Sequence, residues 1–168
     1  NNASGNFIED SFFTLVDPSS AINANVSVTD VLCFGGADGT ATATASGGTA
    51  PYTINWGNIN PNFLTEGTYN VSVTDSNGCS VLETFSILQP SQLLVSGFVS
   101  GGVIGTGNSN GEITGQVAGG TPFPGIPGTY KYSVNGGVFS SNPVFSNLNA
   151  GAYIISYQDY NNCTLSET

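Results

Sequence analysis

The sequence has almost no positive charge and no histidine. Lys131 is the only basic side chain among 168 residues, against eleven Asp and Glu, and the formal net charge is −10. Nucleic acids and anionic membrane surfaces bind proteins through lysine and arginine, so neither is an expected partner. Acid–base or phosphoryl-transfer chemistry would depend on carboxylates, tyrosines and one lysine. No catalytic arrangement of these residues is evident, and we expect a protein that is not an enzyme.

Long apolar runs and metal-binding spacings are scarce as well. No stretch approaches 18 apolar residues, so this part of the protein is not expected to insert into a membrane. The absence of Cys-x-x-Cys and histidine leaves zinc poorly supported. We expect no cofactor. Calcium at the turn aspartates Asp75 and Asp159 is the remaining alternative, although no dense Asp-x-Asp pattern is present.

What the chain does contain is an internal repeat. Residues 5–49 recur 72 positions later, so that Asp38-Gly39 corresponds to Asn110-Gly111 and both precede a Gly-Gly-Thr triplet at equal spacing. Self-similarity at a fixed period indicates tandem modules. The repeat predicts three parts. Residues 1–18 are the C-terminal strands of a preceding repeat, 19–90 a first complete repeat, and 91–168 a second, degenerate and longer repeat that is truncated at its C-terminal end.

Apolar and polar residues alternate with a period of two, which predicts half-buried strands. Asn-Gly and Asp-Gly turns separate these strands, as in a β-sandwich. The shared Leu-x-x-Gly-x-Tyr spacing at Tyr69 and Tyr153 is typical of the tyrosine at a Greek-key corner. We therefore predict two immunoglobulin-like, all-β sandwiches. Their cores are expected to contain Tyr52, Ile54, Trp56, Val71, Val73, Tyr130, Tyr132 and Ile155.

The three cysteines predict one disulfide bond. Cys33 and Cys79 flank the first unit, and a bond between them would close this small module; the alternative is two inert buried thiols. Cys163 corresponds to Cys79 in the second unit, but Gly105 stands at the position that corresponds to Cys33. Cys163 is therefore expected to be an unpaired buried thiol, with a crosslink to another chain as the alternative.

The second unit also carries two six-residue insertions, one on each side of the strand around Tyr132. They are expected to emerge at opposite ends of the sandwich, which argues against one composite binding site. Phe123 and Ile126, in the first insertion, are predicted to pack on a neighbouring module or partner chain rather than to grip a ligand.

Several segments resemble the SprB-type repeat: Cys33 to Gly39, Gly47 to Trp56, Gly67 to Tyr69 and Val73 to Cys79. That repeat occurs many times in very large surface proteins of the Bacteroidetes, including gliding-motility adhesins. The likeness is close over 33–79. Over 103–163 it is degenerate, because the first cysteine, the Pro-Tyr junction and the tryptophan are missing. The resemblance implies export by the type IX secretion system and an extracellular location at the cell surface, in filaments.

The expected function is a non-catalytic structural segment of a large secreted adhesin or filament, with adhesion and gliding motility as possible roles. Short proline-containing junctions restrict bending, which predicts a rod-like array. The expected partners are neighbouring repeats of the same chain or of like chains, with surface glycans or a substratum as further candidates. Two alternatives stay open: a subunit of an extracellular polymer built by strand exchange between chains, and a glycan-binding accessory module of a secreted enzyme.

Overall fold

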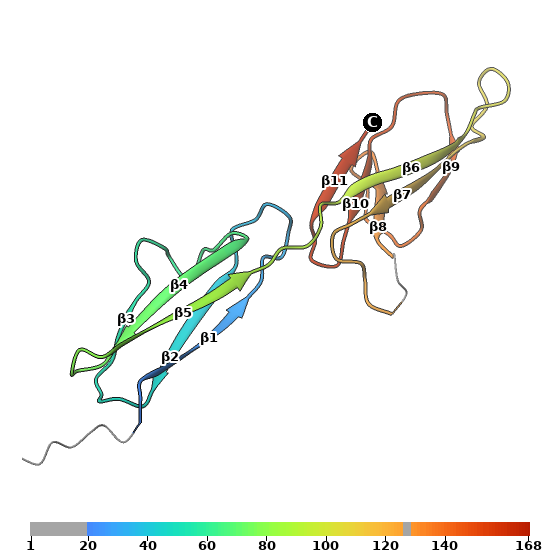
Figure 1. Cartoon of the computed structure of the whole chain (residues 1–168). Coiled ribbons are helices and arrows are strands. Elements are labelled where there is room, and N and C mark those ends of the chain that lie inside the picture. Colours follow the sequence, from blue (N-terminus) through green and yellow to red (C-terminus); the bar gives the residue numbers. More distant parts are fainter. Residues whose placement is uncertain (1–19, 126–128) are drawn as a thin grey trace, which may run out of the picture.

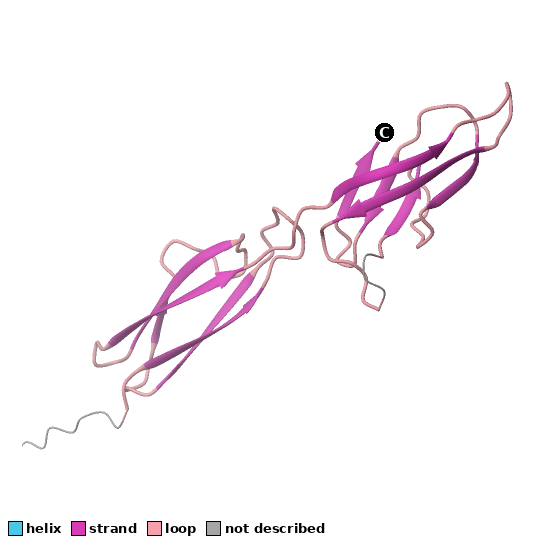
Figure 2. Ribbon diagram, turned by 45° about the vertical axis from the view of Figure 1, so that its right-hand side comes forward, coloured by secondary structure: helices cyan, strands magenta, loops and turns pink. Residues whose placement is uncertain are grey.

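The computed structural model describes residues 20–125 and 129–168, and within them every regular element is a β-strand (Figures 1 and 2). The predicted strands at residues 1–18 lie outside the described residues. The strands are β1 (Asn23–Thr29), β2 (Thr40–Ser46), β3 (Thr53–Asn55), β4 (Gly67–Thr74), β5 (Ser80–Ile87), β6 (Leu94–Gly101), β7 (Gly111–Ala118), β8 (Lys131–Val134), β9 (Val144–Leu148), β10 (Ile155–Gln158) and β11 (Thr164–Glu167).

The first module contains β1 to β5 in two antiparallel sheets, β1-β2 and β3-β4-β5. The alternation in β2 sends Ala41 and Ala43 inward, where they meet Val71 of β4 and Phe85 and Ile87 of β5 in one buried cluster. Because both sheets contribute to this cluster, the module is a sandwich.

The second module contains β6 to β11, again in two antiparallel sheets, β6-β7-β9 and β8-β10-β11. The chain crosses from one sheet to the other between β7 and β8, between β8 and β9, and between β9 and β10. This is the order of an immunoglobulin-like Greek key, which confirms the predicted fold class. The two modules lie end to end in both views, with a single chain connection between β5 and β6 (Figures 1 and 2).

Both predicted tyrosine corners are present. The Tyr69 hydroxyl donates to the Thr65 carbonyl oxygen at 3.0 Å, and the Tyr153 hydroxyl donates to the Asn149 carbonyl oxygen at 2.9 Å. In each module the bond reaches four residues upstream, to the segment that enters β4 or β10. In the second module it fixes the corner at which the chain passes from the sheet of β9 to the sheet of β10, and in the first it fixes the entry to β4 from Leu64, which bridges Gly39 next to β2.

The predicted core residues are buried or half-buried, with one exception. Ile54 is 40% exposed although it pairs with the fully buried Val73. The prediction was wrong because β3 is a three-residue strand at the sheet edge. Its counterpart Tyr132 is 8% exposed, because the second insertion folds back and exchanges two backbone hydrogen bonds between Tyr132 and Ser140. This insertion covers the strand edge instead of projecting from the end of the module.

The two cores differ at two positions, where a larger side chain in one strand is matched by a smaller residue in the strand that faces it. The repeat aligns Ala43 with Gly115 and Val73 with Tyr157. A Cβ atom on Gly115 would lie 3.0 Å from the Tyr157 ring and 3.2 Å from the Tyr132 ring. The larger side chain in β10 therefore requires the smaller residue in β7, since a packed interior leaves no spare volume.

Candidate functional site

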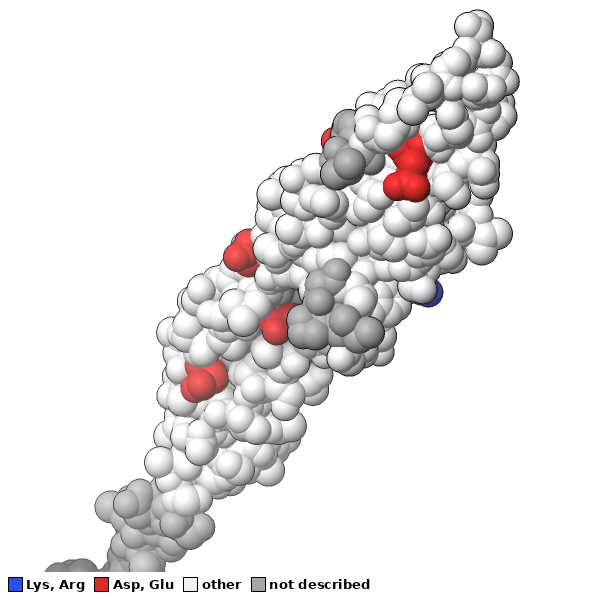
Figure 3. All heavy atoms as spheres, turned by 90° about the vertical axis from the view of Figure 1, so that its right-hand side faces the viewer, with Lys and Arg blue, Asp and Glu red and all other residues white. Residues whose placement is uncertain are grey.

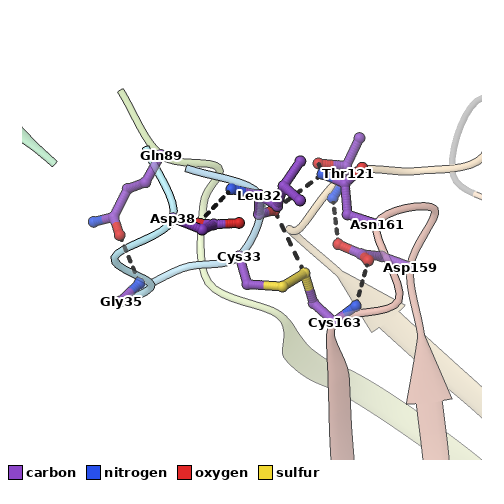
Figure 4. The surroundings of a disulfide bond; sticks show 9 residues. All are labelled: Leu32, Cys33, Gly35, Asp38, Gln89, Thr121, Asp159, Asn161 and Cys163. Atoms are coloured by element: carbon purple, nitrogen blue, oxygen red, sulfur yellow. Dashed lines mark hydrogen bonds between the residues drawn. A yellow bond between two sulfur atoms is a disulfide. The ribbon is translucent and has the colours of Figure 1, made fainter. Parts of the chain in front are cut away.

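A disulfide bond joins the two modules (Figure 4). Cys33 lies in the loop between β1 and β2, and Cys163 lies in the turn between β10 and β11. Their sulfur atoms are 2.04 Å apart and their Cα atoms 5.7 Å apart, at a sequence separation of 130. Cys79 carries a free, exposed thiol. The predicted Cys33–Cys79 bond is therefore wrong, and so is the prediction that Cys163 is unpaired.

The direction of β5 explains why Cys33 and Cys79 do not meet. The Leu88 amide at the end of β5 donates to the Asp30 carboxylate at 2.8 Å, next to the loop that holds Cys33. Cys79 immediately precedes the first residue of β5. Eight extended residues span about 26 Å, whereas a disulfide requires Cα atoms within about 7 Å. The two thiols thus lie at opposite ends of the module.

The loop that carries Cys33 is held to its own module. The Leu32 amide donates to the Asp38 carboxylate at 3.2 Å, and the Gly35 amide donates to the Gln89 side-chain oxygen at 2.6 Å (Figure 4). Gly35 has φ +74°, a conformation that favours glycine. These bonds fix the loop against the end of β5, so that it presents Cys33 toward the second module.

Polar contacts accompany the disulfide across the junction. The Asn161 side-chain amide donates to the Leu32 carbonyl oxygen at 2.9 Å and to the Thr121 hydroxyl at 3.1 Å (Figure 4). The Cys163 sulfur lies 3.4 Å from the same Leu32 oxygen. Because a disulfide sulfur carries no hydrogen, that distance marks a close contact rather than a hydrogen bond. The Leu32 carbonyl oxygen thus contacts two residues of the second module, Asn161 and Cys163.

The connecting segment leaves little free chain between the modules. Val31 donates its amide to the Leu88 carbonyl oxygen at 2.9 Å, which binds the segment to the first module. Gly120 donates its amide to the Ser91 carbonyl oxygen at 2.8 Å, which binds it to the second. Leu93 is already in the second core. Only the residues around Pro90 remain as a joint, and proline restricts its rotation.

The junction encloses a hollow with a volume of about 240 Å³, lined by residues of both modules. Pockets for small organic ligands typically measure roughly 300–1,000 Å³. The hollow is smaller than that, so its size does not support a ligand pocket at the junction.

Asp75 organises the β4–β5 turn that carries Cys79. Its carboxylate accepts hydrogen bonds from the amides of Thr49 at 3.0 Å, Asn77 at 2.9 Å and Cys79 at 2.9 Å. Burial raises the pKa of the Asp75 carboxyl, but these amides and that of Gly78 together outweigh burial and lower the pKa below its ordinary value. Asp75 is therefore a structural carboxylate, ionised because the backbone surrounds it with donors.

Asp159 occupies the same position in the second module. Its carboxylate accepts hydrogen bonds from the amides of Thr121 and Cys163, each at 2.9 Å. Gly120 has φ +58°, and a Cβ atom there would lie 2.7 Å from the Asp159 carboxylate oxygen. In each repeat the second glycine of the Gly-Gly-Thr triplet lets the backbone come close to this aspartate, because a side chain there would collide with the carboxylate. The aspartate in turn fixes the conformation of the turn that holds a cysteine.

Acidic side chains are scattered singly over the face shown in Figure 3. Within residues 20–125 and 129–168, no group of three or more His, Cys, Asp and Glu side chains lies close enough to hold a metal ion. Calcium at Asp75 or Asp159 stays an alternative drawn from the sequence. In the described part of the chain, both carboxylates accept hydrogen bonds from backbone amides.

Phe123 packs on its own module. Its ring lies edge-on to Tyr160, with centroids 5.6 Å apart, and the Lys131 ammonium group lies 5.0 Å from the ring centroid. The predicted packing on a neighbouring module or partner is therefore not what the described contacts show. Ile126, the other residue of this predicted contact, lies outside the described residues.

Sequence reasoning missed the junction residues Leu32, Gln89 and Asn161. One signal was available: both repeats place an asparagine two residues before the turn cysteine, Asn77 before Cys79 and Asn161 before Cys163. Recurrence of this pair marks a shared role of the turn. It does not reveal that the role is a contact with another module.

Residues 25–61 match the family model of the SprB repeat, so the first module contains a SprB-type repeat. A search of curated proteins found no significant match, and a search of solved structures found none either. No helix in the described residues is long and apolar enough to cross a membrane.

Proposed function

We propose that this chain, which contains a SprB repeat in its first module, is a non-catalytic spacer in a large secreted adhesin or filament at the cell surface. The family match supports a repeat of cell-surface proteins, and adhesion or gliding is the specific role we infer. Export by the type IX secretion system belongs to the same proposal. The disulfide supports an oxidising, extracellular setting, because cytosolic thiols are normally kept reduced.

The observation that carries the spacer role is the double covalent connection between the modules. A peptide linker and a disulfide both cross the junction, and Asn161 adds a hydrogen bond between them. Two separated connections oppose both bending and twisting, which one flexible linker does not. A segment with such a junction suits the transmission of position and load along a filament.

The aromatic residues give little support to a glycan-binding module. Tyr130, Tyr132 and Tyr157 are buried in the second core, and Phe123 packs against Tyr160. Sugar-binding surfaces usually present exposed aromatic faces. Among the described residues Phe34, Phe63 and Tyr160 are exposed, but Phe34 lines the hollow at the junction and Tyr160 packs edge-on against Phe123. The spacer therefore remains the function that the geometry supports best.

Small-angle X-ray scattering on the oxidised chain tests the spacer shape. An eight-residue strand spans about 26 Å, and with its loops a module measures about 40 Å, so two in line give a radius of gyration of about 24 Å. A compact globule of 168 residues would have a radius of gyration of about 15 Å. A value near the latter refutes the rod.

The cellular part of the proposal needs a separate test. Antibodies raised against this chain should label intact, unpermeabilised cells that produce it. Brief protease treatment of those cells should remove the label. Labelling that appears only after permeabilisation would refute the surface location, whatever the scattering result.

A further inference from the structure

The surface of the second module that grips the first is built around one turn. Cys163 in this turn bonds to Cys33, and Asn161 donates one side-chain hydrogen to the Leu32 carbonyl oxygen and the other to Thr121. The partner is the β1–β2 loop of the preceding module. Together these residues form a docking surface for such a loop.

The first module carries the same surface, assembled by the same internal bonds. The Thr49 and Cys79 amides donate to Asp75 at 3.0 and 2.9 Å, and the Asn77 side chain donates to the Thr49 hydroxyl at 3.0 Å. The corresponding distances in the second module are 2.9, 2.9 and 3.1 Å. The turn of the first module is thus in the conformation that docks a loop in the second.

Two groups on this surface have no partner among the described residues. The Cys79 thiol is free and exposed. The Asn77 amide has two hydrogens, and the described chain provides an acceptor, the Thr49 hydroxyl, for one of them. These are the two groups whose counterparts, Cys163 and Asn161, contact the loop of the first module.

The chain itself does not supply the missing partner. Cys33 is already bonded to Cys163, and the corresponding loop of the second module has Gly105 in place of the cysteine. That loop keeps the same local fold, since the Ile104 amide donates to Asn110 as Leu32 does to Asp38. It has no thiol, and the backbone at Gly105 has φ +91°, a conformation that Cys33 does not adopt.

We propose that the Asn77–Cys79 turn is a docking surface for the β1–β2 loop of another SprB-type module that has a cysteine at the position of Cys33. Cys79 forms a disulfide with that cysteine, and Asn77 donates to the carbonyl oxygen one residue before it. Each module then grips the loop of the module before it. Because Gly105 replaces the cysteine, this series of disulfides ends after the second module. The inference rests on the internal equivalence and stands even if the protein is not an adhesin.

The bond forms by oxidation of two thiols, which together lose two protons and two electrons. A small-molecule disulfide in the buffer takes these up and becomes two thiols, through a mixed disulfide with Cys79. Cys79 is exposed, so the reagent can reach it.

The test uses the full chain with residues 19–90 duplicated in tandem, so that Pro90 of the added copy is followed directly by Ser19 of the original copy, as Pro90 is followed by Ser91 in the natural junction. The first measurement is made on the unextended chain: after alkylation and denaturation, mass analysis should find one labelled cysteine, Cys79. A protease that cleaves at Asp and Glu then separates the cysteines for mapping, because Lys131 is the only residue of the chain at which trypsin could cleave.

In the extended chain, equilibrated in a redox buffer of glutathione and its disulfide, we expect Cys33 of the added copy to be bonded to Cys79. The original Cys33–Cys163 bond should persist, and the label should move to Cys79 of the added copy. A labelled Cys79 in the original copy, or a bond within either copy, would overturn the proposal.

A pair of variants separates docking from random thiol pairing. Asn77→Ala should lower the equilibrium constant for the new disulfide roughly 5-fold, the effect expected for one lost hydrogen bond. Asn62→Ala, at another exposed asparagine of the same module, should leave it unchanged. Equal values for the two variants would show that the turn does not recognise the loop. Neither result depends on cellular location, so the proposed function can fail without this inference failing.

Discussion

Replacing Cys163 with serine should destabilise the first module, although Cys163 belongs to the second. When the first module unfolds alone, its chain between Cys33 and Leu93 stays attached at both ends to the folded second module. Closing a loop of about 60 residues restricts the unfolded chain by about 4 kcal/mol in the chain-entropy model. Without the bond, the free energy of unfolding of the first module should fall by about that amount.

Trp56 makes this effect measurable in one module. It is the only tryptophan in the chain, and its ring meets Phe85 edge-on at a centroid distance of 5.8 Å in the first core. Its fluorescence during unfolding in urea therefore reports the first module. The midpoint should shift to lower urea concentration, and the slope m should stay the same or rise, because an unfolded chain released from the loop is less compact.

Cys79→Ser is the matched control, because it removes a cysteine from the module that contains Trp56 yet breaks no bond in the structure. It should leave the midpoint unchanged, and reduced wild-type protein should behave like Cys163→Ser. The reasoning is refuted if Cys163→Ser leaves the midpoint unchanged and Cys79→Ser lowers it, since Cys33 would then be bonded inside its own module.

Three further predictions concern single sites. Tyr157→Phe should stabilise the second module by about 1 kcal/mol in calorimetry, because the buried Tyr157 hydroxyl has no hydrogen-bond partner among the described residues; a loss of stability would reveal a partner. Gly115→Ala should destabilise that module by about 1–3 kcal/mol through contact with the Tyr157 and Tyr132 rings, and adding Tyr157→Val should restore part of the loss; additive losses in the double variant would contradict the packing argument. Asp75 has a lowered pKa in the fold, so its contribution to stability is present above its ordinary pKa and is lost as pH falls through the folded value. Asp75→Asn should therefore flatten the acid side of a stability-against-pH curve, measured by urea midpoints, and an unchanged curve would count against the role of Asp75.

Local sequence patterns were enough to predict the fold class. Alternation and turn residues act over a few positions, and the Leu-x-x-Gly-x-Tyr spacing directly reflects the hydrogen bonds of Tyr69 and Tyr153. Ile54 was wrongly assigned to the core, because alternation predicts the face of the sheet on which a side chain lies. It does not predict whether other residues cover that face at the edge of the sheet. Coverage depends on a segment remote in sequence, as the contact of Ser140 with Tyr132 shows.

The cysteine pairing could not be predicted in the same way. It depends on which end of the module each turn occupies and on the contact between modules, and neither leaves a trace in local periodicity. The unmatched Cys163 and the missing cysteine at Gly105 were the useful signals. If cysteines are allowed to pair between neighbouring modules, these two signals indicate the observed Cys33–Cys163 bond. If each module is treated as self-contained, Cys79 is the partner predicted for Cys33.

The disulfide also determines how tension would travel through the chain. If both modules lost their fold under a force applied between Ser20 and Thr168, the taut path would run from Ser20 to Cys33, across the bond, and from Cys163 to the end. That path contains about 20 residues and extends to about 70 Å, whereas the reduced chain of about 150 residues would extend to about 520 Å. Most of both modules would thus be shielded from load while the bond is intact. A bond inside the first module would shield only that module, so the position of this crosslink, between neighbours, is the one that the proposed filament role requires.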